Sequence, residues 1–313
     1  MKTIAQFVRD GINNPTELQD ALQTAMRLEF STIPPYLCAE WSIGSDDPDG
    51  VGDLIHEIVV QEMFHFALAG NMLAAIGGAP RIANAGFLPT YPTNTLPGGI
   101  HQELPVDLKP LSKDQLQVFM QIETPEFPPV ELALRAVAPA TIGAFYDTIS
   151  NAFDAVNPVI DQNAHFVAQG AEVFQIKSIT DAHNAINRIK GEGEGAPGSP
   201  DQPANPSELA HFYVFKEILV GNVLKLDPAT GKLVKGNPIR FPAVLPFAPS
   251  TAVPSPSIAF NQALSQLLTD LEACWTTGAA LRIALGDMFT LQQKGQDLIR
   301  RGIRPEFAWA AQA

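Results

Sequence analysis

The sequence predicts an all-α protein: a four-helix bundle with additional helices and long Pro/Gly-rich loops, in one domain over residues 1–313. Three observations support this prediction. Residues 55–73 form an apolar stretch of helical composition that no Pro or Gly interrupts before Gly70. A Glu-x-x-His pair lies in this stretch, and the same pair recurs late in the chain. Two further glutamates lie in other helical stretches, one before each pair.

The first pair is Glu62 and His65. They are three residues apart, so they share one face of a helix, and that face is surrounded by apolar residues. A buried carboxylate and imidazole are costly unless something pairs with them, and a metal ion can do so. Glu-x-x-His on one helix is half of the ligand set of a carboxylate-bridged two-metal site in a four-helix bundle. For a single copy, a partly exposed pair on a helix surface is the favoured explanation.

The second pair is Glu208 and His211, at the start of another apolar helical stretch. A complete site needs two more carboxylates, each on its own helix. Glu29 and Glu194 supply them, in the order Glu, Glu-x-x-His, Glu, Glu-x-x-His. This order is much more specific than either pair alone. The predicted metal ligands are Glu29, Glu62, His65, Glu194, Glu208 and His211.

The first core helix is expected over residues 15–43. Asn14 is a good N-cap, and Pro15 suits the first helical position. Further along, Pro34 and Pro35 remove two backbone donors, so we expect them to kink or break the helix.

The second core helix is expected over residues 53–76, because Gly77, Gly78 and Pro80 follow. Residues 80–110 are rich in Pro and Gly, and long irregular connections in compact domains are often binding loops. We expect this loop to cover the entrance to the metal site. Glu123 flanks a proline, so we interpret it as a capping or solvated residue.

The third and fourth core helices are expected over residues 181–194 and 206–221. Glu194 lies among glycines at a helix C-terminus, where the dipole disfavours a negative charge unless a cation is near. An exposed turn residue is the alternative for Glu194. Glu208 follows an Asn-Pro-Ser start and could simply cap its helix. His211, one turn later, has no such explanation.

The remaining chain is expected to pack on the bundle. Residues 227–232 have turn composition between two apolar stretches, which indicates a small hairpin. Residues 258–300 read as an accessory pair of amphipathic helices with few candidate ligands, for packing or an interface.

Composition limits the function. The formal charge of −13 argues against nucleic acid and anionic membranes as partners. The two cysteines, Cys38 and Cys274, make no disulfide framework and are expected to be reduced. The N-terminus has no apolar run of signal length, so we expect a soluble cytoplasmic protein. No Gly-x-Gly-x-x-Gly or Walker-type loop follows an expected strand, and the sequence has no motif for Ser-dependent hydrolysis or covalent haem.

Residues 28–37, LEFSTIPPYL, resemble the signature of a bacterial ferritin-like family. That family includes the ferritin-like domain of iminophenyl-pyruvate dimer synthases, which act in bisindole pigment pathways. The resemblance runs over residues 22–298. One departure is Ala144, where the family often has Glu. Other similar segments follow in the family's order: 61–65, 71–73, 76–80, 96–99, 122–125, 193–195 and 211–215.

The resemblance implies a ferritin-like fold and a role in secondary metabolism. A ligand set rich in carboxylates, with two histidines, suits iron or manganese better than the metals of two-metal hydrolytic sites. We therefore expect two iron ions, with manganese as the alternative, in an oxidase or oxygenase that acts on a small amino-acid-derived imine. The alternative function is a non-catalytic metal-binding or scaffold protein, whose site Ala144 leaves incomplete. The expected partners are the small-molecule substrate and either a second copy of the chain or a pathway enzyme.

Overall fold

The computed structural model describes residues 2–124, 141–193, 209–227 and 232–310. The all-α prediction is confirmed, since these residues form helices and one two-stranded sheet. The elements are α1 (Ile4–Asp10), α2 (Pro15–Trp41), α3 (Val51–Ala75), η1 (Pro97–Gly99), α4 (Lys113–Ile122), α6 (Ile142–Val156), α7 (Ile179–Gly193), α8 (His211–Val220), β1 (Asn222–Asp227), β2 (Lys232–Pro238), α9 (Ile258–Thr276) and α10 (Leu281–Arg300).

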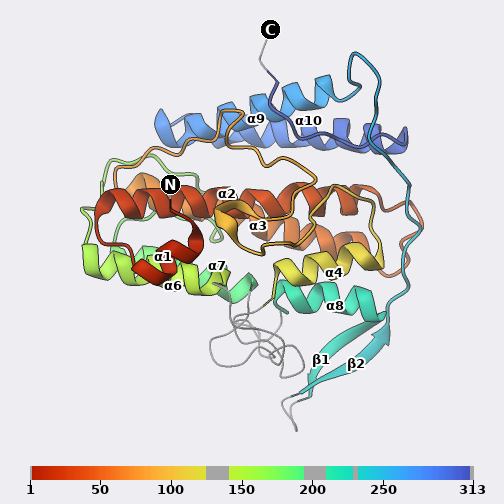
Figure 1. Cartoon of the computed structure of the whole chain (residues 1–313), viewed down its shortest axis with the longest axis horizontal. Coiled ribbons are helices and arrows are strands. Elements are labelled where there is room, and N and C mark those ends of the chain that lie inside the picture. Colours follow the sequence, from red (N-terminus) through yellow and green to blue (C-terminus); the bar gives the residue numbers. More distant parts are fainter. Residues whose placement is uncertain (1, 125–140, 194–208, 228–231, 311–313) are drawn as a thin grey trace.

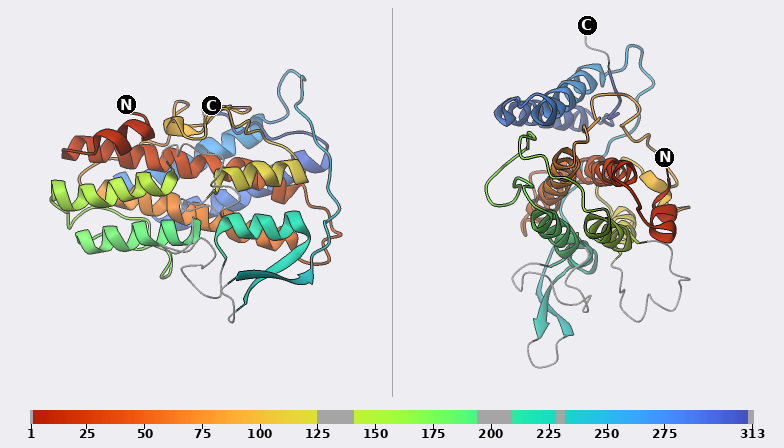
Figure 2. Two further views of the ribbon diagram at one scale, coloured as in Figure 1. Left: turned by 60° about the horizontal axis from the view of Figure 1, so that its bottom comes forward. Right: turned by 90° about the vertical axis from the view of Figure 1, so that its left-hand side faces the viewer.

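The bundle has two long helices and two pairs of short ones. The long helices α2 and α3 pack along each other through the middle of the molecule (Figure 1). On one side of them, α4 packs against α8 and α6 packs against α7. Figure 2 shows α6 and α4 roughly end to end, and α7 and α8 likewise. Two of the four bundle positions are therefore each built from two half-helices.

Helix α2 begins as its sequence predicts, because the Asn14 side chain accepts a hydrogen bond from the Glu17 amide. The expected break at Pro34 and Pro35 is wrong, since α2 continues to Trp41. A proline at position 35 leaves the Ser31 carbonyl without its helical donor. The hydroxyl of Tyr91 replaces that donor at 2.6 Å. The proline defect is thus satisfied by another part of the chain.

The loop that carries Tyr91 packs along α2. Phe87 in this loop packs against Phe30, with the rings tilted and their centroids 5.2 Å apart. Gly98 has a φ of +77°, and a Cβ there would lie 2.6 Å from the Ile4 side chain, so only glycine fits. The loop therefore fastens α1 and α2 together.

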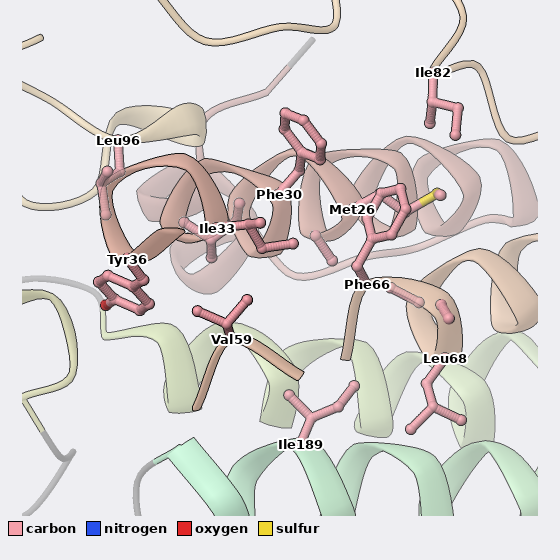
Figure 3. Close-up of a cluster of buried hydrophobic side chains, with 14 of the residues drawn as sticks. Met26, Phe30, Ile33, Tyr36, Val59, Phe66, Leu68, Ile82, Leu96 and Ile189 are labelled. Carbon is pink, nitrogen blue, oxygen red and sulfur yellow. The ribbon is translucent and has the colours of Figure 1, made fainter. Parts of the chain in front are cut away.

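The core lies between α2 and α3. Phe30 and Phe66 meet across these helices with ring centroids 6.0 Å apart, among Met26, Ile33 and Val59 (Figure 3). Helix α3 is the one described helix long and apolar enough to span a membrane, but 78% of its most apolar window is buried in the bundle. Its apolar character is therefore that of a core helix.

The α9–α10 hairpin forms a further layer on the opposite side of α2 and α3 from the half-helices (Figure 2). Two glycines let this layer approach closely. A Cβ at Gly295 would collide with the Trp41 ring, and one at Gly70 would collide with the Trp275 ring. The expected small hairpin is also confirmed, because β1 and β2 pair antiparallel.

Candidate metal centre

Four of the predicted ligands come together inside the bundle. Glu29 lies in α2, Glu62 and His65 lie one turn apart in α3, and His211 is the first residue of α8. All four side chains are buried. The two imidazoles lie nearly parallel, with ring centroids 5.7 Å apart.

A fifth buried residue, Glu123, completes the cluster from the end of α4. The possible ligand atoms form two groups, and within each group they lie no more than 4.8 Å apart. Glu29, Glu62 and His65 make one group, and Glu62, Glu123 and His211 make the other. Because Glu62 belongs to both, its carboxylate is placed to bridge two ions.

The two histidines are oriented alike. The Nδ1 atom of His65 lies 3.7 Å from Glu29 and 3.9 Å from Glu62, and its Nε2 lies 2.9 Å from Glu192. The Nδ1 atom of His211 lies 2.9 Å from Glu62 and 3.5 Å from Glu123. Its Nε2 lies 2.8 Å from the side-chain oxygen of Gln61. Each ring thus turns Nδ1 inward and gives Nε2 to an outer acceptor, as metal-binding histidines do.

The three carboxylates share a second regularity, because a hydroxyl holds one oxygen of each. Tyr146 donates to Glu29 Oε1 at 2.5 Å, and Thr32 donates to Glu62 Oε2 at 2.8 Å. Tyr36 donates to Glu123 Oε1 at 2.5 Å.

In each carboxylate the other oxygen is the one that faces a histidine Nδ1. Hydrogen bonds of this kind orient ligating carboxylates. The arrangement therefore leaves three inward oxygens and two inward nitrogens around one space.

These residues fit metal ions on two observations. Nδ1 of His211 is fully buried and lies close to the Glu62 and Glu123 carboxylates, yet it makes no well-aligned hydrogen bond among the described residues, although a buried polar atom normally makes one. Three carboxylates gathered away from solvent repel one another unless positive charge joins them. Carboxylate oxygens with imidazole nitrogens are donors that iron and manganese accept.

The comparisons with known proteins agree with the observed fold. The ferritin-like family matches residues 22–220, most of the chain. The chain belongs to the ferritin-like family. The crystal structure of a ferritin like protein from Caulobacter vibrioides is similar in fold, with a TM-score of 0.68 and 21% identity, over 93% of this chain and 97% of that one. No curated protein matches the chain.

Burial and charge also perturb the acid–base behaviour of this ferritin-like site. Burial, followed by repulsion from Glu123, raises the pKa of Glu62 to about 7. Burial lowers the pKa of His65, but the hydrogen bond to Glu192 and the nearby carboxylates of Glu29 and Glu62 outweigh it and raise the pKa to about 10. His211 behaves likewise, with Glu123 and Glu62 raising its pKa to about 9. The carboxylates therefore strongly favour positive charge at both imidazoles, which is what a cation supplies.

Two predicted ligands, Glu194 and Glu208, lie outside the described residues. The helix expected from residue 206 starts later, at His211. Ala210 before it is extended, with a ψ of 152°. The prediction that His211 lies one turn inside this helix is therefore wrong, although the imidazole still reaches the cluster.

The interpretation of Glu123 as a capping or solvated residue is wrong. The residue is only 7% exposed, and its carboxylate accepts a hydrogen bond from the Tyr36 hydroxyl. A signal for this was present, because Leu116, Phe119 and Glu123 recur at helical spacing and so share one face. The nearby Pro125 favours a helix end at this point, so the sequence suggested a capping residue instead of a buried one. Glu192, whose carboxylate lies 2.9 Å from His65 Nε2, was also missed, because the motif order indicated Glu194 instead.

A cavity of about 30 Å³ adjoins Glu29, Glu62, His65 and Glu123. Its other walls come from the ends of half-helices, where α4 and α7 finish and α6 begins. The described residues that line it include none from 80–110. The expectation that this loop covers the entrance stays a prediction. The loop packs along α2, and its His101 lies 3.1 Å from the Ile122 carbonyl, next to Glu123 in the chain.

Proposed function

We propose that this ferritin-like protein is a non-haem di-metal oxidase or oxygenase that works with two iron ions. The observation that carries the proposal is that Glu62 belongs to both ligand groups. In these groups, each carboxylate that turns one oxygen inward has its other oxygen held by a hydroxyl. Glu29 and His65 would hold one ion, Glu123 and His211 the other, and Glu62 both. Iron bound there supplies the electrons that reduce dioxygen.

The chain's own part is to hold the ligands rigidly and to exclude bulk water. Tyr146 and Tyr36 are completely buried, and their hydroxyls fix the rotamers of Glu29 and Glu123. The cavity of about 30 Å³ has room for a molecule the size of dioxygen or water beside the ligands. A larger substrate would approach from the ends of the half-helices, where the cavity walls are built.

For the substrate we propose a small amino-acid-derived imine in secondary metabolism. The support is the resemblance of residues 28–37 to the family that includes the ferritin-like domain of iminophenyl-pyruvate dimer synthases. In this chain the same segment supplies Glu29 and Tyr36, and so contributes directly to the site. Side-chain chemistry within the site does not select a substrate by itself.

The alternative is a metal-binding or scaffold protein without activity. That proposal rested on Ala144, which removes a carboxylate. Ala144 does not line the cavity, and both ligand groups have three members without it. We therefore favour the redox function.

The test is to load the protein with ferrous iron without oxygen and then to add dioxygen. We expect about two ions per chain by metal analysis, and an oxygen-dependent change in the optical spectrum within seconds. Protein loaded with zinc, which has no redox chemistry, is the control and should show no change. Two tightly bound iron ions that do not react with dioxygen would support the scaffold function. A chain that binds no metal would overturn the proposal.

A further inference from the structure

A second and much larger cavity lies on the other side of α2 and α3. Its volume is about 290 Å³, and its lining comes from α2 and α3 on one side and from α9 and α10 on the other. Each helix lines it with one apolar stripe. On α10 the stripe is Leu281, Leu285, Met288 and Phe289, at the spacing of one helix face, and the polar Gln292 lines the cavity one turn further on. A volume of this size is near the lower end for small-molecule sites.

This cavity is distinct from the metal centre. On α2 its lining includes Phe30 and Ile33, whereas Glu29 faces the metal site. On α3 its lining includes Met63, whereas the neighbouring Glu62 is a predicted ligand. The two long helices therefore form a wall with the metal site on one face and the apolar cavity on another.

The cavity is held open by rigid contacts. The Trp41 ring packs against the α10 backbone at Gly295 and stacks on Phe307 at 6.3 Å between centroids. The Trp275 ring packs against Gly70 in α3, and its indole N–H donates to Asn71 at 2.8 Å. These two tryptophans fix the distance between the layers, so the apolar walls cannot simply close on each other.

Two polar side chains in the lining have hydrogen-bonding atoms without partners among the described residues. They belong to Glu40 and Trp41. His56 holds Glu40 Oε1 at 3.0 Å, but the buried Oε2 has no hydrogen-bond partner among the described residues. The indole Nε1 of Trp41, a residue only 5% exposed, also lacks a partner there. Buried polar atoms left in this condition cost stability and indicate a group that would satisfy them.

We propose that this cavity binds an apolar alcohol, with its hydrocarbon part between the helix stripes and its hydroxyl at Glu40 and Trp41. A hydroxyl can donate to a carboxylate and accept from an indole N–H, so it is complementary to both atoms. A fatty acid would place a second negative charge beside Glu40, and an ether could not donate to it. Phe289 lines the cavity yet is 67% exposed, which marks the opening to solvent.

Calorimetric titration of the full chain with n-octanol, heptyl methyl ether and octanoate tests the proposal. The three probes have similar length and differ in the head group. We expect saturable binding of octanol at one per chain, with the ether and octanoate at least about tenfold weaker, as for the loss of one hydrogen bond to a charged group. Equal affinity for all three would refute the head-group assignment, and no binding of octanol would refute the site.

Variants locate the binding. Glu40→Gln should weaken octanol about tenfold, while Glu57→Gln, an exposed carboxylate on α3, should leave it unchanged. Ala67→Phe should fill the cavity and abolish binding, and Val60→Phe serves as a second filling variant if the first does not fold. Unchanged octanol binding in a folded filling variant would place the ligand elsewhere. Sedimentation that shows a dimer dissociated by octanol would make the cavity an interface with a second copy and overturn the proposal.

Discussion

Glu62→Ala should remove both metal ions from the protein, whereas Glu123→Ala should remove only one. Glu62 belongs to both ligand groups, and Glu123 belongs to one. Glu62→Ala leaves each group with two protein ligands. Glu123→Ala leaves Glu29, Glu62 and His65 intact. The loss of a residue that merely supports a ligand weakens metal binding about 10- to 100-fold, so loss of a ligand should exceed that range.

The assay is metal analysis after loading with ferrous iron and desalting, beside far-ultraviolet circular dichroism. Alanine is a strong helix former, so most helical content should remain in both variants. Glu57→Ala, on the exposed face of α3, is the control and should keep two ions. Two ions in Glu62→Ala, or an unchanged count in Glu123→Ala, would refute the assignment of Glu62 as the shared ligand.

The number of bound ions per chain also tests the two histidines and the two remaining predicted ligands, Glu194 and Glu208. His65→Ala and His211→Ala should each lose one ion, because each belongs to one group. Glu194→Gln and Glu208→Gln test the residues that lie outside the described structure. We expect Glu208→Gln to weaken binding less than His211→Ala. If all of these variants keep two ions, the metal is held elsewhere.

Three further predictions concern single contacts. Tyr146→Phe removes the hydroxyl that holds Glu29, so one ion should bind about 10- to 100-fold more weakly in a competition titration, while saturating iron still gives two. Tyr91→Phe leaves the Ser31 carbonyl without its donor and should lower the free energy of unfolding in urea by about 1–3 kcal/mol. Burial raises the pKa of the Cys38 thiol, so iodoacetamide at pH 8 should label it far more slowly in the native protein than after unfolding.

The sequence predicts well those features that are encoded locally. The cap at Asn14 places the start of α2, and helical spacing places Glu62 and His65 on one face of α3. The accessory pair at residues 258–300 corresponds to α9 and α10. These features depend on residues within a few positions of one another, so periodicity and capping rules reach them.

Features that depend on distant contacts were missed or misjudged. Pro34 and Pro35 end no helix, because Tyr91 from a remote loop supplies a missing donor. Glu123 looked solvated beside its prolines, and its burial depends on Tyr36, which is 87 positions away. No local rule contains this information, because tertiary packing decides which polar groups find partners.

The division of the bundle into long helices and half-helices has a mechanical consequence. Glu29, Glu62 and His65 project from the interiors of α2 and α3, which are 27 and 25 residues long. Glu123 and His211 instead stand at the end of one short helix and the start of another, where backbone hydrogen bonding is weakest. One ion position is therefore rigid, and the other can adjust when a short helix shifts. We expect an ion held by Glu123 and His211 to exchange faster than one held by Glu29 and His65.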